Sequence, residues 1–215
     1  MEHFLLTEIP VTAEVEETIK KLRLEEEEDI ELVTGLFEKA KSIARPKAVY
    51  QTAYIDSIEG EAVIIDGTRF TSAVLARNLK DVHRVFAYVS TCGAEVDEWS
   101  HLEKDYVVSL WLDIIKERFL QDANKFIREY IKNKYEIKTL SSVNPGSGNV
   151  ENWPIAQQKL LFPLIGNVEG DIGVRLTDSC LMLPTKSVSG LFYPSDTEFI
   201  NCSLCERKNC PGRRG

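Results

Sequence analysis

The sequence contains no apolar run approaching the roughly 20 residues that a membrane-spanning helix needs. Its first residues lack both the basic and the apolar region of a secretory signal. It also has no P-loop and no glycine fingerprint of a dinucleotide-binding fold. Its three histidines have no serine or cysteine nucleophile in an elbow motif beside them, which removes support for a hydrolase triad. These absences predict a cytoplasmic chain without membrane spans.

An excess of positive charge is also lacking. The chain carries 26 Lys and Arg against 34 Asp and Glu, a formal net charge of −8. Nucleic acids and anionic membranes attract clustered cations, so this balance argues against either as the main partner. The 215 residues are enough to bury a substantial core in one large domain, or in one domain with an extension.

Cysteine is scarce, with five residues in the chain. A reducing cytoplasm keeps thiols free, so these five are not expected to form a disulfide framework. Three of them, Cys202, Cys205 and Cys210, lie within nine residues near the C-terminus, with Cys-x-x-Cys spacing at the start. Such a group can hold three corners of a tetrahedral zinc site or of an iron–sulfur cluster. Cys92, Cys180, a histidine or an external group would be the fourth ligand. Iron–sulfur, zinc and free thiols all stay open.

The first half of the chain predicts helices followed by strands. Residues 11–45 have the apolar spacing of two helices, with Thr12 as a cap for the first. Residues 49–57 and 61–65 read as two strands around a Glu59-Gly60 turn, and residues 85–90 as a third. Residues 94–102 predict a helix.

The longest periodic segment covers residues 105–135. Its apolar stripe runs from Val107 to Ile131 and predicts a helix that backs a sheet. A loop over 141–149, a short helix over 155–165 and short strands and loops from Asp171 onward follow. This order favours an α+β domain over repeated βαβ units.

Two hydroxyl- and glycine-rich segments are candidate ligand loops. In the segment Pro145, Gly146, Ser147 and Gly148, the residues after the proline offer backbone N–H groups, and the glycines leave room for close approach. Ser187, Val188, Ser189 and Gly190 form the second segment. Asp178, in Thr177-Asp178-Ser179, has a side chain that either binds a ligand or caps a local turn. Taken alone, each segment is a weak signal and is more typical of an ordinary turn.

Taken together and in order, these motifs are more specific. The chain resembles the reactivation domain of cobalamin-dependent methionine synthase in four motifs that follow one another. They are Asn-Pro-Gly-Ser-Gly, Gln157-Gln-Lys-Leu-Leu-Phe162, Leu176-Thr-Asp-Ser179 and Ser187-Val-Ser-Gly190. The resemblance is good over residues 141–190 and looser over 49–135. It implies an activation-like domain at 46–215, with residues 1–45 as an N-terminal helical extension. It also implies a curved, mainly antiparallel sheet backed by helices.

The resemblance implies a function as well. Domains of this family bind S-adenosylmethionine in a groove and methylate a corrinoid after an electron has been supplied. Here the groove would be walled by Pro145–Gly148 and Ser187–Gly190, with Asp178 nearby. The sequence has no separate cobalamin module, so the corrinoid would sit on a partner methionine synthase or methyltransferase. Flavodoxin or ferredoxin would be the electron donor, and a cluster in the cysteine tail could relay the electron.

Several family positions differ in this chain. The arginine before the Pro-Gly turn falls on Ser142, the tyrosine after it on Ser147, the helix glutamate on Gln121 and a later tyrosine on Phe199. The arginine and glutamate replacements remove charge-assisted contacts to the carboxylate and amino group of the methionine moiety. They favour a second hypothesis, a non-catalytic docking or assembly subunit with a zinc-bound tail.

Overall fold

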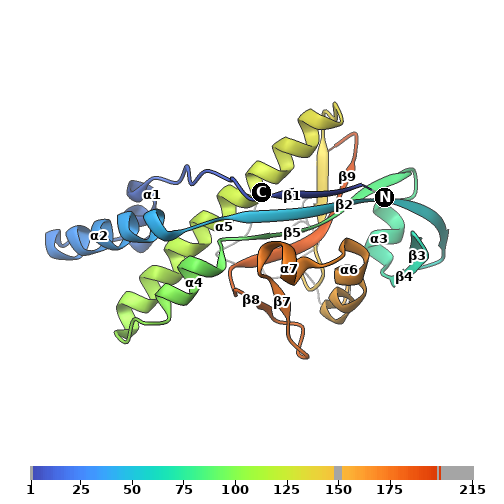
Figure 1. Cartoon of the computed structure of the whole chain (residues 1–215). Helices are drawn as coiled ribbons and strands as arrows, with labels where there is room; N and C mark the ends of the chain where they lie inside the picture. Colours follow the sequence, from blue (N-terminus) through green and yellow to red (C-terminus); the bar gives the residue numbers. More distant parts are fainter. Residues whose placement is uncertain (1, 148–151, 198, 200–215) are drawn as a thin grey trace.

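A computed structural model describes residues 2–147, 152–197 and 199 of the chain (Figure 1). Its strands are β1 (His3–Leu6), β2 (Lys47–Glu59), β3 (Ala62–Ile65), β4 (Thr68–Thr71), β5 (Arg84–Thr91), β6 (Leu140–Val143), β7 (Arg175–Leu176), β8 (Met182–Leu183) and β9 (Ser187–Pro194). Its helices are α1 (Val15–Leu22), α2 (Glu27–Ile43), α3 (Ala73–Asn78), α4 (Ala94–Ser100), α5 (Tyr106–Lys134), the 3-10 turn η1 (Ile155–Gln157), α6 (Gln158–Ile165) and α7 (Val168–Ile172).

Seven strands form one antiparallel sheet: six follow the order β4-β3-β2-β5-β9-β6, and β1 pairs with β2 outside this order. The long strand β2 pairs with β5 along one edge. Its other edge pairs first with β1 and then, beyond a bulge between Ile55 and Ser57, with β3. Strands β7 and β8 form a separate two-stranded hairpin. The predicted α+β class with a mainly antiparallel sheet is confirmed.

The sheet is apolar on both faces because its strands alternate side chains between two helical layers. On one face, Tyr50, Tyr88 and Phe192 pack against Ala123 and Ile127 of α5. The opposite face packs against α6 and α7, and its members include Val49, Val85, Val89, Leu191, Leu161, Ile165 and Ile172. Figure 1 shows α5 crossing behind the sheet and α6, α7 and the β7–β8 hairpin in front.

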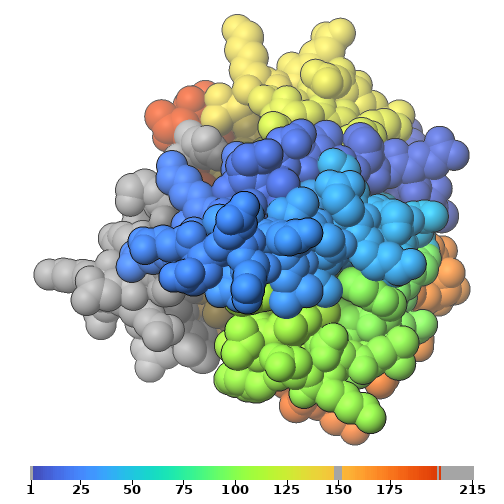
Figure 2. Space-filling model, turned by 90° about the vertical axis from the view of Figure 1, so that its left-hand side faces the viewer, coloured from blue at the N-terminus to red at the C-terminus, as the bar shows by residue number. Residues whose placement is uncertain are grey.

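A third apolar cluster joins α1 and α2 to α4 and the first half of α5. Phe37 of α2 and Phe119 of α5 meet edge to face with ring centroids 5.6 Å apart. In Figure 2 these helices form one end of the molecule, with α1 and α2 in blue and α4 with the start of α5 in green. An ion pair is buried here: Lys116 Nζ lies 2.7 Å from Asp97 Oδ1 and 2.8 Å from the Ser100 hydroxyl.

The structure corrects several local predictions. Residues 3–6 form β1, and residues 68–71 and 73–78 form β4 and α3, which their short patterns did not signal. Part of the predicted 141–149 loop is strand β6. Val107, assigned to the buried stripe of the long helix, is 51% exposed because the first turn of α5 projects beyond the sheet. No described helix combines the length and apolar character needed to cross a membrane.

Thr12 does not cap the first helix, so that prediction is wrong. Glu14 takes the N-cap position, without a side-chain cap. Thr12 instead binds α5: its backbone N–H and that of Ala13 donate to Asp122 Oδ2 at 2.8 and 2.9 Å, and its hydroxyl donates to Asp122 Oδ1 at 2.7 Å. One carboxylate of α5 therefore holds the segment that leads into α1.

We expect Asp122→Ala to lower the free energy of unfolding by about 2 kcal/mol, because three hydrogen bonds to a charged acceptor are lost together. Urea unfolding measures this change, and hydrogen exchange should rise first in α1. Glu129→Ala, at an exposed carboxylate of the same helix, is the control and should change stability by less than about 0.5 kcal/mol. Equal stabilities for both variants would contradict this role of Asp122.

Candidate functional site

The Ser187–Gly190 motif lies within strand β9 and is not a loop. The prediction of a loop here is wrong because every residue of the motif pairs with β5, while β6 pairs with Leu191–Pro194, just beyond the motif. The motif therefore contributes a rigid sheet surface. Ligand contacts from it would come from a fixed strand and its immediate neighbours.

The two serine hydroxyls of this motif are buried and bonded within the protein. The Ser187 hydroxyl lies 2.7 Å from the Pro184 carbonyl oxygen and 3.0 Å from the Thr91 hydroxyl. The Ser189 hydroxyl donates to Gln158 Oε1 at 3.0 Å, and Gln158 Nε2 donates to the Cys180 carbonyl oxygen at 3.1 Å. These serines connect β9 to α6 and to the β7–β8 hairpin. The intervening Val188 packs towards α5.

Gly190 is where the two predicted segments meet. A Cβ built at Gly190 would lie 2.4 Å from Asn144 Nδ2 and 2.5 Å from the Val143 carbonyl oxygen. In that space Asn144 Nδ2 donates to the Ser189 carbonyl oxygen at 2.8 Å and to the Tyr88 hydroxyl at 2.9 Å. The glycine therefore allows the chain before Pro145 to rest against β9.

The turn after Asn144 is built on a second glycine. Gly146 has φ +74°, and its N–H donates to the Trp153 carbonyl oxygen at 2.8 Å. The Ser147 N–H donates to the Asn144 carbonyl oxygen at 3.2 Å. Pro145, Gly146 and Ser147 therefore stand at the edge of the sheet beside β6 and β9, while Gly148 lies outside the described residues.

No polar contact of the described residues joins Asp178 to the Pro-Gly turn or to β9. It is exposed in the turn between β7 and β8. In the described part of the chain its carboxylate has no hydrogen bond or ion pair with either motif. The turn is closed instead by its neighbours, since the Thr177 and Ser179 hydroxyls are 3.0 Å apart and the Leu181 N–H donates to Thr177 Oγ1 at 3.0 Å.

Helix α5 supplies polar groups that the sequence motifs do not include. Arg128 donates from Nη1 to the Leu140 carbonyl oxygen and from Nη2 to the Ser142 hydroxyl at 3.3 Å. Its guanidinium carbon lies 5.4 Å from the centre of the Phe192 ring. One turn earlier, Asn124 Oδ1 is buried without a hydrogen-bond partner among the described residues. Gln121, Asn124 and Arg128 follow one another at intervals of three and four residues, so the sequence alone places them on the same face of the helix.

Gln121 is engaged by its own helix. Its Oε1 accepts from Arg118 at 3.0 Å, and its Nε2 lies 3.4 Å from Glu117 Oε1. Glu117 and Arg118 in turn pair with Lys21 and Glu17 of α1. Helix α1 thus lies beside the Gln121 end of this stripe, and β6 lies beside its Arg128 end.

The two motifs, Asn144–Ser147 and Ser187–Gly190, contain no imidazole, thiol or carboxylate. Their groups are backbone amides, one carboxamide and hydroxyls, and Arg128 of α5 contacts Ser142 just before the first motif. This arrangement can bind and orient a polar ligand, but it offers no acid–base pair. Such a site can promote a reaction by holding the reacting groups in the correct orientation.

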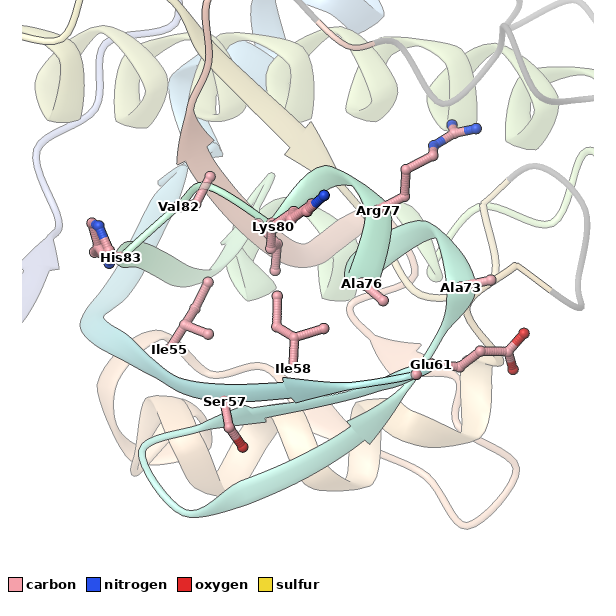
Figure 3. A pocket seen from close by; sticks show the side chains of 12 residues that line it. Ile55, Ser57, Ile58, Glu61, Ala73, Ala76, Arg77, Lys80, Val82 and His83 are labelled. Atoms are coloured by element: carbon pink, nitrogen blue, oxygen red, sulfur yellow. The ribbon is translucent and has the colours of Figure 1, made fainter.

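A separate cavity of about 650 Å³ lies between the β2–β3 hairpin and α3 (Figure 3). Its lining is mainly apolar and includes Ile55, Ile58, Ala76 and Val82, with Ile55 and Ile58 towards its interior and the Arg77 guanidinium directed away from them. None of the predicted ligand residues lines it. It is on the β2 and β3 side of the sheet, whereas the Pro-Gly turn follows β6 at the other edge.

The predicted metal ligands Cys202, Cys205 and Cys210 lie outside the described residues. The two other cysteines, Cys92 and Cys180, are buried free thiols. Within the described ranges no cluster of three or more His, Cys, Asp or Glu side chains could hold a metal ion. Burial, followed by the nearby Asp97 carboxylate, raises the pKa of the Cys92 thiol to about 12. Cys92 is therefore a protonated core residue in its present position.

We expect Cys92 to be unreactive towards a thiol reagent at pH 8 in the folded protein, because only the thiolate attacks. Titration with dithionitrobenzoate tests this. The native titre should be the same for wild type and Cys92→Ala, and in urea the variant should show one thiol fewer. A native titre that falls by one in the variant would contradict the assignment.

Comparison with known proteins adds family and fold information. A family model described as "Vitamin B12 dependent methionine synthase, activation domain" matches residues 80–210. Among solved structures, the chain is similar to one titled "Crystal Structure of the MetH Reactivation Domain bound to AdoHcy". The TM-score is 0.64 at 13% sequence identity, over 93% of this chain and 81% of that one. At this identity the similarity shows a shared fold. No curated protein matches the sequence.

Proposed function

Because the chain belongs to the family of vitamin B12-dependent methionine synthase activation domains, we propose that it binds S-adenosylmethionine and supports the reductive methylation of an inactive corrinoid on a separate partner protein. The sulfonium S–CH3 bond breaks as the methyl group passes to the corrinoid, an external donor supplies the electron, and S-adenosylhomocysteine is released. The partner would be a methionine synthase or another corrinoid methyltransferase, and flavodoxin or ferredoxin would be the donor.

The observation that carries this proposal is the contact of Asn144 with Ser189 and Tyr88 across Gly190. It joins two segments that are far apart in the sequence into one surface at the sheet edge. The polar stripe of α5 borders this surface, with Arg128 against Ser142. A sulfonium ligand with a nucleoside and an amino acid end needs an extended binding surface of this kind.

The chain's own contribution would be binding and orientation. Backbone groups of Pro145–Ser147 and the edge of β9 would hold the ligand, and no side chain needs to accept or donate a proton. Methyl transfer by displacement depends on the alignment of the donor sulfur, the methyl carbon and the acceptor. The Ser187 and Ser189 hydroxyls are already bonded, so their role would be to keep β9 in register.

The experiment is an anaerobic reactivation assay. A cobalamin-dependent methionine synthase that lacks its own activation domain is first inactivated by oxidation. It is then mixed with this chain, a chemical reductant and methyl-labelled S-adenosylmethionine. We expect activity and label to return only when both the chain and S-adenosylmethionine are present. Recovery that does not need S-adenosylmethionine, or no recovery, would contradict the proposal.

A second function is favoured by one specific observation. Gln121, at the position of the family glutamate, is hydrogen-bonded within α5, and Ser142 and Ser147 replace two other ligand positions. These changes suit a non-catalytic docking or assembly subunit whose tail, through Cys202, Cys205 and Cys210, binds zinc. Anaerobic purification separates the alternatives for the tail. A brown protein supports an iron–sulfur electron relay, and a colourless protein with one zinc supports a structural tail.

A further inference from the structure

The cavity between the β2–β3 hairpin and α3 exists because β2 extends beyond its neighbour β5. Strand β5 pairs with β2 only as far as Tyr54, which lies opposite Arg84. Past this point the Ile55 N–H donates to the His83 carbonyl oxygen at 3.0 Å, and a bulge between Ile55 and Ser57 bends β2. The hairpin therefore lacks a neighbouring strand on this side, and the cavity of about 650 Å³ lies there.

Aliphatic side chains stay accessible inside this cavity. Four of its lining residues pack against the main core but are only partly buried: Ile55, Ile58, Ala76 and Val82. Figure 3 shows the two isoleucines projecting from β2 into the space below the segment that follows α3. An apolar body that displaces water from such a surface gains free energy. The volume is in the range of small-molecule sites, which is roughly 300–1,000 Å³.

The charged side chains around the cavity are mainly cationic. Arg77, Lys80 and His83 line it together with one acid, Glu61, although acidic residues outnumber Lys and Arg by 34 to 26 in the whole chain. In Figure 3 the Glu61 carboxylate and the Arg77 guanidinium point away from the two isoleucines. Lys80 is exposed, and its ammonium group forms no ion pair with the described residues. The aliphatic floor is thus bordered by an ammonium group that no carboxylate neutralises.

We propose that this cavity binds a small amphipathic anion, a molecule with a short aliphatic body and one carboxylate. The body lies against Ile55, Ile58 and Val82, and the carboxylate lies at the rim, where it accepts a hydrogen bond from the Lys80 ammonium group. Opposite charges attract and like charges repel, so the lining favours this ligand over a neutral or a cationic one of the same length. No residue of the Pro-Gly turn or of Ser187–Gly190 lines the cavity. The inference is therefore independent of the proposed function.

The test compares three probes with the same alkyl length: octanoate, octan-1-ol and octylamine. Each is titrated into the isotope-labelled full chain, below the concentration at which it forms micelles, and amide signals are followed by NMR. We expect octanoate to bind roughly three- to fivefold more tightly than octan-1-ol, which is the effect of one exposed ion pair. Octylamine should bind more weakly than either. The signals that shift should belong to residues 55–61 and 73–83.

Two variants separate the contributions of charge and apolar surface. Lys80→Met should remove the preference for octanoate over octan-1-ol and leave the affinity for octan-1-ol unchanged. Ile58→Gln should weaken the binding of both by about fivefold, because apolar contact is lost. Lys39→Met and Leu32→Gln, at an exposed lysine and a half-exposed leucine of α2, are the matched controls and should keep the wild-type affinities.

The inference is overturned if the three probes bind equally, if none binds, or if Lys80→Met keeps the preference for octanoate. Sedimentation provides a further check. A wild-type dimer that Ile58→Gln converts to a monomer would show that a second copy of the chain covers the cavity, which also overturns the inference. If Ile58→Gln does not fold, the wild-type preferences and Lys80→Met, at an exposed position, still decide.

Discussion

Gly190→Val should destabilise the protein by about 3 kcal/mol and abolish binding of S-adenosylmethionine. The new Cβ would stand 2.5 Å from the Val143 carbonyl oxygen, which is backbone of β6 and cannot move without disturbing the pairing of β6 with β9. It would also displace Asn144 from Tyr88 and Ser189. Overpacking of this kind costs about 1–3 kcal/mol, and the lost hydrogen bonds add to it.

Thermal unfolding measures the first effect, and a fall in Tm of roughly 6–12 °C is expected for a chain of this size. Ligand binding is then measured well below the Tm of the variant. Gly35→Val is the matched control, because nothing lies within 4 Å of a Cβ at this exposed helical position. It should unfold at or above the wild-type temperature. A wild-type Tm for Gly190→Val would show that Asn144 does not need the glycine.

Lys116→Met should lower the free energy of unfolding by about 3–5 kcal/mol, since it leaves the buried Asp97 carboxylate without its cation. The side chains of Lys116 and Asp97 are only 5% and 8% exposed, and the Nζ–Oδ1 distance is 2.7 Å. The pair fixes α4 against α5 near the start of the long helix. Replacing both partners, as Lys116→Met with Asp97→Leu, should recover most of the loss because no unpaired charge then stays buried.

Urea unfolding of the two single variants and the double variant completes a mutant cycle. Lys125→Met, at an exposed lysine of α5, is the control and should change stability by less than about 0.5 kcal/mol. A double variant that is as unstable as the sum of the single variants would show that Lys116 and Asp97 act independently. Such a result would contradict the structure of this ion pair.

Much of the fold could be predicted from local patterns. The apolar spacing of residues 105–135 is long enough to specify α5, and the alternating segments around Glu59-Gly60 specify β2 and β3. Short elements such as β1 and β4 could not be predicted, because four residues carry too little periodicity. Their structure depends on pairing with β2 and β3.

The candidate site was only partly predictable for a related reason. The order of the two motifs indicates a shared groove, but the contact between Asn144 and Ser189 joins positions 45 apart. Nothing local in the sequence indicates that Ser187–Gly190 is a strand paired with β5, or that Thr12 binds Asp122 across 110 positions. The contact of Arg128 with Ser142 could not be predicted for the same reason, because it depends on β6 lying beside α5.

The replacements at Ser142, Ser147 and Gln121 change side chains and leave the backbone frame of this surface in place. That frame consists of the Asn144 contact across Gly190 and the hydrogen bonds of the Pro-Gly turn.

Calorimetric titration of the full chain with S-adenosylmethionine, alone and with a corrinoid-loaded methionine synthase that lacks its own activation domain, tests the central claim most directly. The account predicts one equivalent of S-adenosylmethionine bound per chain, with binding weakened in Gly190→Val. No binding heat in either condition, confirmed by equilibrium dialysis with labelled ligand, would contradict it and leave the docking-subunit hypothesis as the better account.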